Sequence, residues 1–194
     1  MGPVGLLVGG RETAQVTVMV ALLRGINVGG RGKLPMADLR AIATDLGFDD
    51  VATYIQSGNL VLSTSASAAS VTRDLAAAIA AGTSVTPAVL VRTRSQLAKV
   101  VRDNPFLARG EDAAHLHVTF TDGPAAAVVA QLDLPGYAPE EAIAVGKELH
   151  LFLPNGMGRS KLAADLARQK GPVGTTRNWR TVTTLLAMAD EAAS

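Results

Sequence analysis

The chain has 194 residues, of which 48% are hydrophobic and 18% charged, as in folded globular proteins rather than disordered ones. Its net charge of +1 gives no overall attraction to nucleic acid or to an anionic membrane, so we expect neither as a partner. The absence of cysteine excludes disulfides, thiolate metal sites and cysteine nucleophiles, and it fits a cytoplasmic protein.

The N-terminal segment lacks the pattern of a signal peptide. It has no cationic start, and glycine and proline interrupt its apolar residues. No apolar run approaches the roughly 18 residues that a membrane-spanning helix needs. We therefore expect residues 1–15 to be a loose extension, added by an upstream start-codon assignment.

Residues 16–93 alternate between strand and helix patterns. The first strand is apolar on both faces, so both faces require burial. The predicted elements are strand Val16–Leu23, helix Met36–Leu46, hairpin strands Val51–Gln56 and Leu60–Ser63, a helix from Val71 to about Gly82, and strand Pro87–Arg92. This β-α-β-β-α-β order is that of the ferredoxin-like, or split βαβ, unit.

The same order returns after a connecting helix and loop over residues 94–112. In residues 113–176 the predicted elements are strand His115–Thr121, helix Pro124–Leu132, hairpin strands Glu141–Val145 and Glu148–Leu153, helix Ser160–Arg168, and a last strand near Pro172–Thr175. Residues 177–194 are predicted to hold a terminal helix from about Arg177 to Ala189, with a threonine as its N-cap and Trp179 in the core.

We therefore predict an α+β fold, an alpha-beta plait of two ferredoxin-like (split βαβ) subdomains with antiparallel sheets and helices on one face, plus the C-terminal helix. Because the first strand requires burial on both faces, the two halves should pack together rather than move on a linker.

The glycine-rich loop between the first strand and the first helix is the first candidate binding site. Glycine allows backbone N–H groups to approach a ligand, and the start of a helix favours negative charge. The loop matches neither GxGxxG nor the P-loop motif, and a turn with solvated cations is the alternative. The candidate ligand-binding residues are Arg24, Gly25, Asn27, Gly29 and Lys33.

Two further predicted helix starts and one hairpin tip carry similar side chains. If they converge with the loop, they form a pocket for a phosphate or carboxylate; if they do not, each is only a cap or a turn. For the hairpin tip, a turn without a ligand is the favoured interpretation. The candidate residues are Arg159, Ser160 and Lys161, then Thr176, Arg177 and Asn178, and at the hairpin tip Ser57 and Asn59.

The three histidines, His115, His117 and His150, are predicted to lie on one polar sheet face. No acidic residue stands at an obvious ligand spacing beside them, so we predict no metal site. Glu140 and Glu141 are interpreted as a solvated strand edge.

Five motifs resemble one family over residues 18 to 190. They are ALLRGINVGG at 21–30, KLPM at 33–36, TYIQSGN at 53–59, RSKL at 159–162 and TTRNW at 175–179. The sequence is similar to the bacterial family catalogued as domain of unknown function 1697. The resemblance implies two ferredoxin-like subdomains in a cytosolic protein, and it implies no activity because the family's name assigns none.

The leading functional hypothesis is a binding protein for a small anionic or phosphate-bearing ligand, without a cofactor. The first alternative is a transferase or hydrolase acting on that ligand, with Arg24 or Lys161 stabilising developing charge. The second is an RNA-binding module, which the near-neutral charge and seven aromatic residues disfavour. The oligomeric state is left open.

Overall fold

The computed structural model describes residues 15–27, 32–169 and 174–194. Its first half is a ferredoxin-like subdomain with four antiparallel strands in the order β2-β3-β1-β4. Its elements are β1 (Thr17–Arg24), α1 (Met36–Asp45), β2 (Asp49–Tyr54), β3 (Asn59–Thr64), α2 (Ala68–Gly82) and β4 (Ala88–Thr93).

The second half repeats this topology, with strand order β6-β7-β5-β8. Its elements are η1 (Ala113–His115), β5 (Leu116–Thr121), α5 (Ala125–Val129), η2 (Leu134–Tyr137), β6 (Glu141–Val145), β7 (Glu148–Phe152), η3 (Met157–Arg159), α6 (Lys161–Arg168) and β8 (Gly174–Asn178). The connection contains α3 (Arg94–Arg102) and α4 (Pro105–Ala108), and the chain ends in α7 (Trp179–Glu191). The predicted fold class is confirmed.

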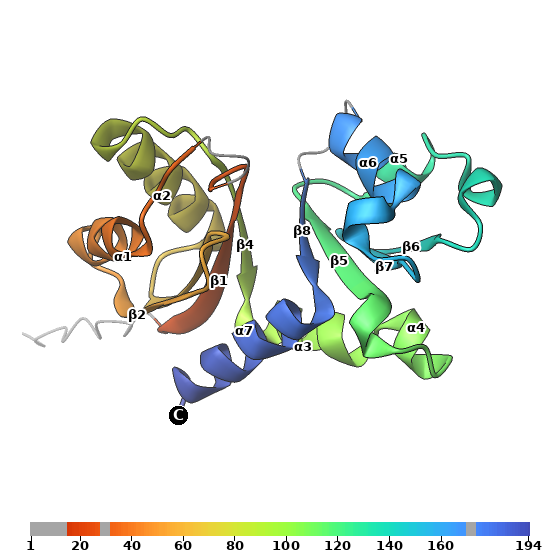
Figure 1. The fold of residues 1–194 in the computed structure, drawn as a ribbon. Helices are drawn as coiled ribbons and strands as arrows, with labels where there is room; N and C mark the ends of the chain where they lie inside the picture. Colours follow the sequence, from red (N-terminus) through yellow and green to blue (C-terminus); the bar gives the residue numbers. More distant parts are fainter. Residues whose placement is uncertain (1–14, 28–31, 170–173) are drawn as a thin grey trace, which may run out of the picture.

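Each subdomain has a core between its sheet and its own two helices, and a third core joins the two halves. The two faces of β1 divide between cores: Met19, Ala21 and Leu23 face α1 and α2. Val18, Val20 and Leu22 instead enter the shared core with β5, α3 and α7. In Figure 1, α3 and α7 pass beneath both sheets, close to β1 and β5. The apolar character of both β1 faces therefore reflects two packing partners.

The end of the chain differs from the prediction. The strand β8 extends to Asn178, and α7 begins at Trp179 with the Asn178 side chain, not a threonine, as its N-cap. Thr175 and Arg177 alternate inward along β8, where their polar groups find buried partners. The inward-facing residues of β8 are therefore polar. A search for alternating apolar residues does not detect such a strand.

Predictions for residues 1–14, Gly29 and the start of the last strand lie outside the described residues. Within the described ranges, none of the helices has the length and apolar character that a membrane crossing requires.

Candidate functional site

A cleft of about 300 Å³ lies where the end of β1 meets the second subdomain. β1 and β8 lie side by side at this junction (Figure 1). One wall is polar and comes mainly from strands; its side chains are Arg24, Thr119, Thr121, Thr175, Thr176 and Gln169. The other wall, called the apolar wall below, consists of Val128, Met157, Ala163, Leu166 and Ala167.

Among the described residues, the polar wall presents one cation and a hydrogen-bonded pair of hydroxyls. The side chain of Arg24 is exposed at the end of β1 and forms no ion pair with the described residues. The hydroxyls of Thr119 and Thr176 are 2.7 Å apart. Their mutual bond uses one hydroxyl hydrogen, so the second hydrogen remains for a ligand. None of the described residues lining the cleft is acidic.

Arg177, predicted to bind the ligand directly, is a buried cation behind this wall. The residue is 7% exposed, and its Nη1 donates to Thr175 Oγ1 at 2.7 Å. Nε donates to Asn59 Oδ1, and Nη2 donates to the carbonyl oxygens of Leu23 and Ser57 at 2.9 and 3.0 Å. Burial lowers the pKa of its guanidinium to about 10, so Arg177 keeps its charge at neutral pH.

These bonds connect the β2–β3 hairpin to β1 and β8. Asn59 is fully buried, and its Nδ2 donates to Ser57 Oγ and to the Tyr54 carbonyl. Gly58 has φ +72°, and a Cβ there would lie 2.7 Å from atoms of Leu23 and Ile26. The predicted hairpin-tip residues Ser57 and Asn59 therefore orient Arg177 and do not line the cleft.

The glycine-rich loop is closed by Asn27. Asn27 Nδ2 donates to the carbonyls of Leu34 and Gln56, and Asn27 Oδ1 accepts from the Leu34 N–H. Its φ of +53° is one that asparagine tolerates better than most residues. Asn27 and Lys33 line a separate open hollow beside α1, whereas Arg24 and Gly25 line the cleft. The described residues of the loop thus line two separate surfaces.

The predicted anion site at the start of α6 is occupied by the chain's own carboxylate. Ser160 caps the helix by accepting from the Ala163 N–H. Glu140 Oε2 accepts from Ser160 Oγ at 3.0 Å and from the Leu162 N–H at 2.9 Å. Glu140 is 7% exposed, so its interpretation as part of a solvated edge is wrong. Arg159 and Lys161 are exposed and do not line the cleft.

The prediction that all three histidines share one face is wrong. His150 lies opposite Val118 in the β5–β7 register, so it is on the other sheet face from His117. His115 belongs to η1 before the strand. His150 lines a second cavity, of about 130 Å³, and burial lowers its pKa to about 4. In the described part of the chain, no three His, Cys, Asp or Glu side chains could hold a metal ion together.

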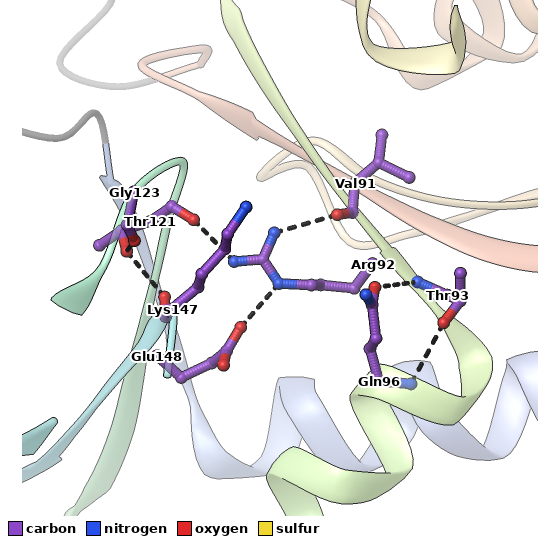
Figure 2. A network of polar contacts seen from close by, with 8 residues as sticks. All are labelled: Val91, Arg92, Thr93, Gln96, Thr121, Gly123, Lys147 and Glu148. Carbon is purple, nitrogen blue, oxygen red and sulfur yellow. Dashed lines mark hydrogen bonds and ion pairs between the residues drawn. The ribbon is translucent and has the colours of Figure 1, made fainter. Parts of the chain in front are cut away.

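A buried ion pair, absent from the sequence predictions, joins the subdomains next to the cleft (Figure 2). Arg92 on β4 contacts Glu148 on β7 at 2.6 Å, with side chains 8% and 14% exposed. Arg92 also donates to the carbonyls of Val91 and Thr121. Because Thr121 lines the cleft, Arg92 fixes the position of one of its walls. The sequence does show a charged residue, Arg92, at the end of an apolar strand. Its neighbours in the sequence do not indicate that its partner is Glu148, 56 residues away.

These features define a class of protein: two ferredoxin-like subdomains that share a core and enclose a cleft lined by an arginine and threonines. The chain matches the family described as "Protein of unknown function (DUF1697)" over residues 16–150, and it belongs to that family. This confirms the resemblance in the sequence.

The fold is similar to the structure of the conserved bacterial protein SP0830 from Streptococcus pneumoniae. The two share 25% sequence identity with a TM-score of 0.73, over 90% of this chain and 99% of that one. None of the curated proteins matches this chain.

Proposed function

We propose that the cleft between β1, β8 and α6 binds a small anionic ligand, bearing a phosphate or carboxylate group, in a cytoplasmic protein. The observation that carries this proposal is positive charge around the cleft that has no acidic partner among the residues the structure describes. Arg24 stands at the rim, and the Arg177 guanidinium lies behind Thr175, whose side chain lines the cleft.

The environment of Arg177 supports a preference for anions. All of its hydrogen-bond acceptors are neutral: backbone carbonyls, an amide oxygen and a hydroxyl. Among the described residues it forms no ion pair. A buried charge is screened less than an exposed one, so its potential extends into the adjoining cleft. An anion there would offset part of the cost of burying Arg177.

The test is binding of inorganic phosphate and pyrophosphate, measured by calorimetry and by thermal unfolding at constant ionic strength. We expect the unmodified protein to bind and to unfold at a higher temperature with the ligand. Arg24→Gln should weaken binding roughly tenfold, because a hydrogen bond to a charged group contributes about 1.5–3 kcal/mol. Arg24 is exposed, so its replacement leaves the core intact.

Arg180→Gln is the matched control, since Arg180 is an exposed arginine at the start of α7 that does not line the cleft. It should bind both anions as the unmodified protein does. Equal weakening by both substitutions would show nonspecific charge attraction, and no binding of either anion by the unmodified protein would refute the proposal.

The two alternatives stay predictions. A transferase or hydrolase would use the same cleft with Arg24 near the developing charge, whereas Lys161 lies outside it. An RNA-binding module of this fold needs an open sheet face for base stacking. Here α3, α7 and the facing sheet cover that face of the central strands β1 and β5, which favours the small-ligand proposal.

A further inference from the structure

The two walls of the cleft differ in chemistry. The cation and the hydroxyls lie on β1, β5 and β8, whereas the apolar wall comes from α5, η3 and α6. Inorganic phosphate could use only the first wall. The cleft therefore has more apolar surface than an isolated small anion can contact.

The apolar wall is formed mostly by side chains that are only partly buried in the core. On α6, Leu162 is fully buried against the sheet, while Leu166 is only partly buried. Met157, in η3, is 37% exposed and is one of the large apolar residues that stay exposed in the described part of the chain. Burying these groups would contribute a favourable free energy of about 25 cal/mol per Å² of apolar area removed from water. A ligand with its own apolar group would recover part of that gain.

We infer that the ligand is amphipathic, an alkyl or aryl phosphate or carboxylate whose anionic group lies at Arg24 and whose apolar group packs on Leu166 and Met157. This inference rests on the proposed function, because binding of the anionic group at Arg24 determines how the ligand is oriented in the cleft. The flexible thioether of Met157 suits apolar groups of varied shape.

The experiment compares inorganic phosphate with methyl, propyl, hexyl and phenyl phosphate by calorimetry. Each added methylene should tighten binding about threefold to fourfold, the factor expected for burying one CH₂ group. The increase should level off once the chain fills the cavity of about 300 Å³.

Met157→Gln tests the apolar wall at an exposed position, where folding is not at risk. It should reduce the gain per methylene by a larger factor than it changes the affinity for inorganic phosphate, because that anion contacts the polar wall. Leu166→Gln should do the same more strongly. Leu107→Gln is the control, because Leu107 on α4 is 38% exposed, close to the exposure of Met157, and does not line the cleft.

The outcomes separate this inference from the proposed function. If inorganic phosphate binds and affinity does not change with chain length, the cleft takes a small anion and the inference is wrong. A chain-length gain that survives Met157→Gln and Leu166→Gln also overturns it. If no phosphate in the series binds, the proposed function and the inference fail together.

Discussion

Arg177 is a buried cation whose hydrogen bonds go to groups of the chain itself. Its charge and planar donors suit an anion, as expected from the sequence. The structure instead directs those donors to Asn59, Thr175 and the carbonyl of Leu23. The guanidinium thereby connects β8 to β1 and to the β2–β3 hairpin, and its charge acts on the cleft only from behind.

Replacing Arg177 by methionine should therefore destabilise the protein. The substitution leaves buried acceptors unpaired, and each costs about 1–3 kcal/mol, so the free energy of unfolding should fall by about 3 kcal/mol or more. Urea unfolding measures the change. Arg180→Met, at an exposed arginine three residues along the chain, should change it by less than about 0.5 kcal/mol. Similar small losses in both variants would contradict the structural role.

At the scale of elements, the starts of the helices decide which predicted sites remain available. The α6 N-terminus has the amides and the flanking cations of an anion site, but Glu140 supplies the anion. At α7 the Asn178 side chain caps the helix. The end of β1 differs, because Arg24 and Gly25 line the cleft there.

Glu140→Ala should loosen the first turn of α6. Ser160 Oγ and the Leu162 N–H would lose a buried acceptor, which lowers the free energy of unfolding by about 1–3 kcal/mol and speeds hydrogen exchange at the Leu162 amide. The adjacent Glu141 pairs with Arg109 at the surface, so Glu141→Ala should cost less than about 1 kcal/mol and leave that amide protected. A larger loss of stability in Glu141→Ala than in Glu140→Ala would refute the role of Glu140 as the buried acceptor at the start of α6.

At the scale of the whole molecule, the two subdomains are joined by an apolar core and by polar bridges beside it. β1 contributes to both its own core and the shared core, so neither subdomain has a complete interior alone. The Arg92–Glu148 pair joins β4 to β7 at the edge of this interface (Figure 2). The shape of the cleft depends on these contacts between subdomains.

A double-mutant cycle can measure the Arg92–Glu148 bridge. Arg92→Met, Glu148→Gln and their combination should give a coupling energy of about 2 kcal/mol, because a desolvated pair interacts strongly and either partner alone is left buried. The Arg94–Asp190 pair, with side chains 50% and 48% exposed, is the comparison and should couple by less than about 1 kcal/mol. A coupling no larger than that of this surface pair would show that the bridge does not hold the subdomains together.

The regular elements were predictable because their information is local. The apolar spacing over Met36–Leu46, the Ser57-Gly58-Asn59 turn and the Ser160 cap each act within a few residues. The position of the last strand is not predictable locally because Thr175 and Arg177 are polar, and Arg177 finds its partners Asn59 and Leu23 more than 100 residues away. The burial of Glu140 is not predictable locally either, since its partners Ser160 and Leu162 follow 20 and 22 residues later.

Two ferredoxin-like subdomains and the family can be predicted from the sequence, because strand and helix periodicity and short motifs are properties of neighbouring residues. Which basic residues face an open cleft, and which bond within the protein, depends on contacts between residues far apart in the chain. Arg24 and Thr176 line the cleft, Arg177 is buried behind it, and the α6 start holds Glu140. A cation or a free amide binds an acceptor within reach, and the fold determines whether that acceptor belongs to the chain or to a ligand.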